Sequence, residues 1–172
     1  MALLNKNLKI NFFRLGPIFL LYFLSITETD TQFSNLFEIL SFNLQLIVIY
    51  FWMLKTPSVI GNGHIFFAGI INDVITGLPL GTSSLSYLVV SLVAAYIRSV
   101  SVKMTLPTDW FTFGIAVFFS NLTFLVLLSN FTTRTVLYTD LFYNSLFTIL
   151  FFPFFWLIFN IYLTIGPLGK ND

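Results

Sequence analysis

The chain has no cysteine and one histidine, His64, among its 172 residues. Without cysteine it can form neither a disulfide nor a thiolate nucleophile, and it can hold no cysteine-ligated zinc or iron–sulfur centre. A lone histidine cannot supply a histidine-based metal cluster, and the sequence shows no Ser-His-Asp triad or paired-carboxylate spacing. We therefore expect a protein that is not an enzyme and that has no cofactor or metal.

Charge is also scarce, because only 9% of the residues are Asp, Glu, Lys or Arg and the net charge is +1. Soluble domains carry about 25% charged residues. A net charge this small gives no basic surface for nucleic acid. What the chain has instead is 57% hydrophobic residues and a mean hydropathy of +0.91. This composition predicts an integral membrane protein, embedded in the lipid bilayer, with little mass outside it.

Six apolar stretches predict six membrane helices. They cover residues of about 10–27, 36–54, 59–77, 82–97, 110–129 and 141–165. A spanning helix needs about 20 residues, so the third and fourth stretches are short, and only a Gly-Pro-Gly turn joins them. No small-x-small cleavage site follows the first stretch, so we expect a retained helix rather than a signal peptide. The predicted fold class is an all-α, compact bundle of six transmembrane helices, a single domain over residues 1–172.

The positions of Lys and Arg predict the orientation, since they concentrate on the cytoplasmic side. Six crossings with both termini in the cytoplasm place seven basic residues inside and one outside. The inner ones are Lys6, Lys9, Arg14, Lys55, Arg98, Lys103 and Lys170, and the outer one is Arg134. If the third stretch did not cross the membrane, five basic residues would lie inside and three outside. The acidic residues Glu28, Asp30, Glu38 and Asp140 fall on the outer side of the favoured topology.

Asp73 lies inside an apolar run, where an acid costs about 2.5–3.5 kcal/mol on membrane-insertion scales. Gly69, Asp73 and Gly77 recur every four residues and share one helix face. Small residues at this spacing let a second helix approach closely. Three interpretations remain open: Asp73 anchors a polar contact inside the bundle, reaches water at the outer interface, or binds a ligand or proton.

Three asparagines fall at a depth similar to that of Asp73 in the favoured topology. They are Asn43 of the second stretch, Asn121 of the fifth and Asn144 of the sixth. Amide side chains form hydrogen bonds across membrane helices. The sequence therefore predicts an outer-half polar cluster of these three asparagines with Asp73.

Other residues predict turns, a kink and the membrane interface. Pro79 and Gly81 indicate that the third helix stops before residue 82, with Gly81 able to take a positive φ. Pro153 lies within the last stretch and predicts a kink there, because proline removes a backbone hydrogen bond. Trp52 and Trp110 fit an aromatic belt at the membrane surface.

Two segments of the chain resemble the rod shape-determining MreD family. The first is Trp52-Met-Leu54 followed by Pro57, and the second runs from Gly69 through Asp73 and Gly77 to Gly81. They match a Trp-x-Leu-x-x-Pro helix end followed by Gly-x-x-x-Asp-x-x-x-Gly and a Leu-Gly turn. The last stretch agrees more loosely, through Asn144 and Pro153. The nearly uncharged C-terminal tail departs from the family, whose members often end in Lys or Arg.

The resemblance implies a non-enzymatic component of the bacterial inner membrane that takes part in cell elongation. Its expected partner is MreC, and indirect partners are the MreB filament, RodA and a class B penicillin-binding protein. The alternative is a substrate-binding subunit of an energy-coupling-factor vitamin transporter, which is also a compact six-helix bundle. Those subunits usually carry Ala-x-x-x-Ala in the first helix, whereas residues 10–27 contain no alanine.

Overall fold

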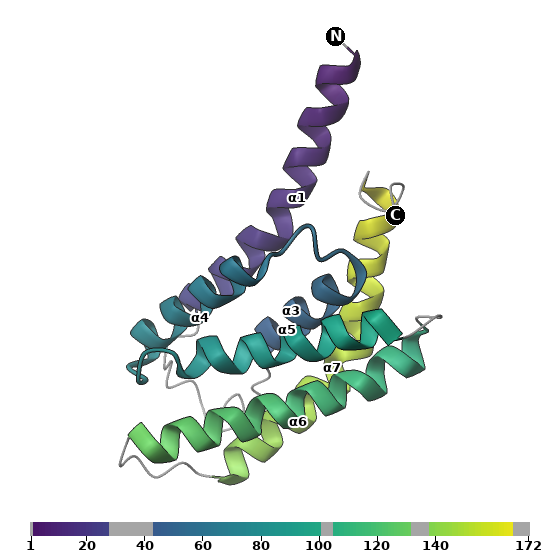
Figure 1. Cartoon of the computed structure of the whole chain (residues 1–172). Helices are drawn as coiled ribbons and strands as arrows, with labels where there is room; N and C mark the ends of the chain where they lie inside the picture. Colours follow the sequence, from purple (N-terminus) through teal and green to yellow (C-terminus); the bar gives the residue numbers. More distant parts are fainter. Residues whose placement is uncertain (1, 28–42, 101–104, 132–137, 167–172) are drawn as a thin grey trace.

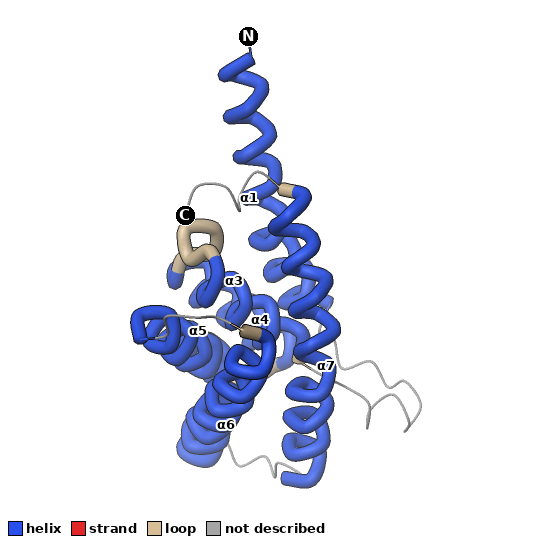
Figure 2. Tube along the Cα trace, turned by 90° about the vertical axis from the view of Figure 1, so that its right-hand side faces the viewer, coloured by secondary structure: helices blue, strands red, loops and turns tan. Residues whose placement is uncertain are grey.

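The computed structural model describes residues 2–27, 43–100, 105–131 and 138–166, and these ranges contain helices and no strand. The helices are α1 (Ala2–Thr27), α3 (Leu44–Lys55), α4 (Asn62–Thr76), α5 (Thr82–Val100), α6 (Leu106–Phe131) and α7 (Tyr138–Ile165), as Figure 1 shows. The predicted all-helical class is confirmed. The start of α1 extends beyond the other helices, toward the same end of the bundle as the end of α7 (Figures 1 and 2).

Three of the described helices are long and apolar enough to cross a membrane, namely α5, α6 and the Thr139–Ile165 part of α7. By contrast, α3 has 12 residues and α4 has 15. At 1.5 Å per residue they measure about 18 and 22 Å, less than the hydrocarbon core of about 30 Å. A helical membrane protein fits this structure, while the six crossings remain a prediction.

Part of the sequence-based prediction lies outside the described residues. This applies to residues 36–42 of the second stretch and to six charged residues used for the orientation: Glu28, Asp30, Glu38, Lys103, Arg134 and Lys170. The third stretch was predicted at about 59–77, and α4 begins three residues later, at Asn62, after the extended Gly61 (φ −78°, ψ 158°). Glycine is a weak helix former, and the residues from Pro57 to Val59 form a turn after α3 instead.

The short helix α3 forms the centre of the core. It packs against α1, α5, α6 and α7, and every residue from Gln45 to Leu54 is buried. A helix that is apolar on all sides belongs in an interior. Trp52 is only 1% exposed, and its ring centroid lies 5.8 Å from that of Tyr162. The predicted interfacial position is therefore wrong for Trp52, because other helices enclose α3, whereas Trp110 is 42% exposed.

A side chain of α6 compensates for the proline inside α7. Pro153 has no N–H, so it cannot donate to the carbonyl of Ile149 four residues earlier. The indole Nε1 of Trp110 donates to that carbonyl oxygen at 2.7 Å. In a membrane helix such a freed carbonyl needs a partner from a neighbouring helix or water. The helix α7 continues through Pro153 from Tyr138 to Ile165, and the kink expected at this proline remains a prediction.

This contact predicts that Trp110 and Pro153 are energetically coupled. Trp110→Phe should lower the free energy of unfolding by about 1–3 kcal/mol, because it leaves the Ile149 carbonyl without a donor. With Pro153→Ala already present, the new backbone N–H can bond to Ile149, so the same change should cost less. Unfolding followed in detergent by tryptophan fluorescence gives the double-mutant cycle. Strictly additive costs would contradict the pairing.

Candidate functional site

The side chain of Asp73 caps the start of the next helix. Asp73 lies in the last turn of α4 and is completely buried. Its Oδ2 accepts a hydrogen bond from the Gly81 N–H at 2.7 Å, and its Oδ1 accepts one from the Ser83 N–H at 2.8 Å. These amides belong to the N-terminal end of α5, where N–H groups lack helical partners and the helix dipole favours a negative charge. The carboxylate therefore satisfies one N–H in the first turn of α5 and one in the residue just before it, from the preceding helix.

The backbone of the same residue ends α4. The Asp73 carbonyl accepts from the Gly77 N–H and, at 2.9 Å, from the Leu78 N–H. Gly77 is left-handed with φ +66°, and Gly81 has φ +100°. This is the glycine-terminated helix end that satisfies the last free carbonyls, and the positive φ predicted for Gly81 is confirmed. Asp73 thus controls both the end of α4 and the beginning of α5.

Gly69 places the backbones of α4 and α5 in direct contact. A Cβ at this position would lie 2.6 Å from the backbone nitrogen of Ser84 and 2.8 Å from its Oγ. The Ser84 hydroxyl also donates to the Phe66 carbonyl of α4 at 3.0 Å. Glycine allows this approach because it has no Cβ. Of the three interpretations of Asp73, burial excludes simple contact with water, and the hydrogen bonds support an anchoring role.

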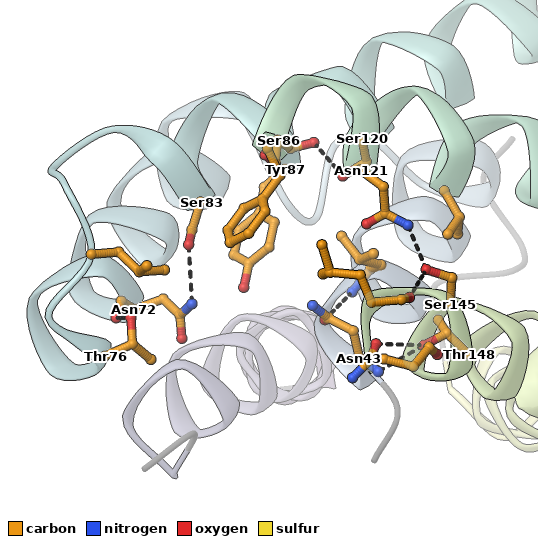
Figure 3. A pocket seen from close by; sticks show the side chains of 16 residues that line it. Asn43, Asn72, Thr76, Ser83, Ser86, Tyr87, Ser120, Asn121, Ser145 and Thr148 are labelled. Carbon is orange, nitrogen blue, oxygen red and sulfur yellow. Dashed lines mark hydrogen bonds between the residues drawn. The ribbon is translucent and has the colours of Figure 1, made fainter. Parts of the chain in front are cut away.

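A polar cavity of about 200 Å³ lies between α3, α4, α5, α6 and α7 (Figure 3). Many of the residues that line it carry an amide or hydroxyl group: Asn43, Asn72, Asn121, Asn144, Thr76, Ser83, Ser86, Ser120, Ser145 and Thr148. The structure therefore brings the three predicted asparagines to one cavity. It does not place Asp73 there, because the Asp73 carboxylate is turned toward α5. The neighbouring Asn72, which the sequence did not single out, takes that place.

Two of the three asparagines, Asn43 and Asn121, join α7 to neighbouring elements. Asn43 is not inside a helix as expected but caps α3, with its side-chain oxygen accepting from the Leu46 N–H at 3.2 Å. Its own N–H donates to Thr148 Oγ1 of α7 at 2.8 Å. Asn121 Nδ2 of α6 donates to Ser145 Oγ of α7 at 2.6 Å. The helix α7 therefore receives polar contacts from the start of α3 and from α6. Within α7, the Thr148 hydroxyl donates to the backbone carbonyl of Asn144 at 2.7 Å.

An ion pair between a partly exposed lysine and a buried aspartate, at the other end of α3, was not predicted from the sequence. Lys55 Nζ lies 2.9 Å from Asp109 Oδ2, and Asp109 is 1% exposed. Trp156 Nε1 donates to the same oxygen at 3.0 Å, and Lys55 lies 5.6 Å from the centre of the Trp156 ring. These residues join α3, α6 and α7. A lysine ending one apolar stretch and an aspartate beginning another, both on the predicted inner side, are the signal that could have suggested the pair.

Asp73 variants separate its hydrogen-bonding role from its charge. Asp73→Asn keeps one oxygen acceptor and should lose about 1–3 kcal/mol of folding stability, since one buried N–H remains without a partner. Asp73→Leu removes both acceptors and should cost roughly twice as much. Thermal unfolding in detergent and the yield in membranes measure the difference. Equal damage from both variants would indicate that the charge itself matters.

Alanine substitutions at Gly69 and Gly63, both in α4, give a test variant and its matched control. Gly69→Ala should destabilise the protein by about 1–3 kcal/mol, because the Ser84 backbone cannot move aside without separating the helices. Among the described residues nothing lies within 4 Å of a Cβ at Gly63, so Gly63→Ala should be neutral or stabilise the helix by up to about 1 kcal/mol. Unfolding temperatures of both variants test the contact, and equal behaviour would refute it.

No family model, curated protein or solved structure matches this chain. The resemblance to the MreD family therefore depends on the residues themselves. In the structure Trp52 lies in the central helix, and Pro57 lies in the turn after it. Gly69, Asp73, Gly77 and Gly81 belong to the joint between α4 and α5. Within the described ranges no group of three or more His, Asp or Glu residues could hold a metal ion.

Proposed function

We propose that the chain is an MreD-like, non-enzymatic component of the cell-elongation machinery in the bacterial inner membrane. One observation carries this proposal: the residues of the Gly69–Gly81 signature build a structural joint. Gly69 gives the close approach of α4 and α5, Asp73 caps α5, and Gly77 and Gly81 adopt positive φ. A signature whose groups are engaged in shaping the bundle is what a scaffold requires.

The membrane part of the proposal has independent support. Three described helices have the length and composition of membrane spans. The start of α1 and the end of α7 lie toward the same end of the bundle (Figure 1), which agrees with two termini on one side. In the proposed topology that side is the cytoplasm, and the turn between α4 and α5 lies near the outer surface.

The proposed partner is MreC, and through it the MreB filament, RodA and a class B penicillin-binding protein. A membrane scaffold binds such partners through lipid-facing helix surfaces, because little of the chain lies outside the bilayer. Large apolar side chains are exposed on α6 and α7, among them Phe111, Phe118 and Phe154. These surfaces would contact lipid or the transmembrane helix of a partner.

The polar cavity favours a second candidate, the substrate-binding subunit of an energy-coupling-factor vitamin transporter. Such a subunit needs an enclosed site of amide and hydroxyl groups within a small helical bundle. Against it, residues 10–27 contain no alanine, whereas these subunits usually present Ala-x-x-x-Ala to the coupling subunit. The scaffold is therefore the preferred proposal.

Affinity purification from native membranes distinguishes the two candidates. The tagged protein should recover MreC and elongation synthases in mild detergent, and depletion of the protein should make rod-shaped cells round. The Asp73→Leu variant should lose the partners, while Gly63→Ala should retain them. Proteomics and small-molecule mass spectrometry are applied to the same eluate. Recovery of ATP-binding subunits with a stoichiometric vitamin, and unchanged cell shape, would overturn the scaffold.

A further inference from the structure

A groove runs along α6 where it meets α7. Two adjoining hollows form it, of about 580 and 710 Å³, and Gly114, Phe118 and Ile149 line both of them. Along α6 its lining extends from Pro107 to Leu125, which is about 27 Å of helix. The hydrocarbon core of a bilayer is about 30 Å thick, and both helices are long and apolar enough to cross it. The groove is therefore about as long as the bilayer core is thick.

A glycine leaves the middle of the groove open. Among the described residues, a Cβ placed on Gly114 would meet only Ile149 Cδ1 of α7, at 3.9 Å. That distance is an ordinary van der Waals contact, so the helices do not need glycine here for a close approach, in contrast to Gly69. What Gly114 contributes is the absence of a side chain, and a larger residue at this position would fill the groove.

The polar groups beside the groove bond to one another. Asn121 Nδ2 donates to Ser145 Oγ at 2.6 Å, and Trp110 Nε1 donates to the Ile149 carbonyl oxygen at 2.7 Å. No charged side chain is among the described residues that line the groove. A charged or strongly polar occupant would lose its hydration without replacement. This surface therefore favours hydrocarbon.

The edges of the groove are bulky. Phe111, Phe118 and Phe142 line it and are exposed. Helices associate in membranes through small residues that let their backbones approach closely, and through hydrogen bonds between helices. The phenylalanine rings would hold a third helix away from Gly114, whereas a single hydrocarbon chain can pass between them. We propose that the groove holds one acyl chain of a bilayer phospholipid, packed along α6 across Gly114.

Van der Waals contact holds this chain in place. A gap beside a protein surface loses the contacts that its lining could make, and lipid chains surround the two helices in the membrane. A chain in the groove has protein atoms on more sides than a chain against a flat helix face, so it should exchange more slowly with the surrounding lipid. The site rests on the groove alone and does not depend on the partners proposed above.

Cross-linking from the lipid locates the chain. The protein is reconstituted in vesicles of phosphatidylglycerol and phosphatidylethanolamine, part of which carries a diazirine in one acyl chain. Leu122 lines the groove, and Leu92 is an equally apolar, exposed control on α5. After irradiation, peptide mass spectrometry should find about threefold more lipid adducts at Leu122, because a chain in the groove touches two walls and a floor instead of one side.

Filling the groove should remove this difference. Gly114→Leu should lower the adducts at Leu122 to the level at Leu92, whereas Gly63→Leu, the same change outside the groove, should leave them unchanged. Thermal unfolding verifies that each variant folds, and Leu146→Trp, at an exposed groove residue of α7, serves if Gly114→Leu does not fold. Equal adducts at Leu122 and Leu92 in the unmodified protein, or undiminished adducts in a folded groove-filling variant, would overturn the proposal. Fewer adducts at Leu122 than at Leu92 would also overturn it and would mean that a protein helix covers the groove.

Discussion

The arrangement of the bundle depends on the bond between the Asp73 carboxylate and the first amides of α5. An acid inside a membrane protein is unfavourable unless its charge is compensated. Here two backbone N–H groups and the positive end of a helix dipole provide that compensation at one point. Because the same residue also ends α4, the angle between the two helices is fixed over few residues. The close contact at Gly69 then holds the pair together along its length.

The helices α1, α5, α6 and α7 are arranged around α3, which is too short to reach both ends of a bilayer and is buried from Gln45 to Leu54. Its start is joined to α7 through Asn43 and Thr148. Its end is joined to α6 and α7 through Lys55, Asp109 and Trp156. Polar contacts at both ends with apolar packing between them give α3 a fixed depth. The cavity lies beside the first of these contacts, where amide and hydroxyl groups from five helices converge.

The positions of the helices along the chain could be predicted from the sequence better than the contacts between them. Apolar stretches located the described helices to within a few residues at most ends, since apolar length is a local property. Trp52 was misplaced because its neighbours along the chain do not show that α3 is enclosed by other helices. The Lys55–Asp109 pair was missed because its partners are separated by two helices in the sequence. The asparagine cluster was predicted from depth alone, and Asp73 was wrongly included because depth does not show where a side chain points.

What the sequence determined by itself was the class of protein and the local shape of the α4–α5 turn. The scarcity of charge indicates a lipid environment, and glycine and proline limit backbone angles wherever they occur. Only the tertiary structure decided which groups become partners. It directed the Asp73 carboxylate to backbone N–H groups at the start of α5, while the side chain of the neighbouring Asn72 donates to Ser83 Oγ beside the cavity. Adjacent side chains on a helix point about 100° apart. The packing of α4 against its neighbours therefore determines that Asp73 binds the start of α5 and that Asn72 lies beside the cavity.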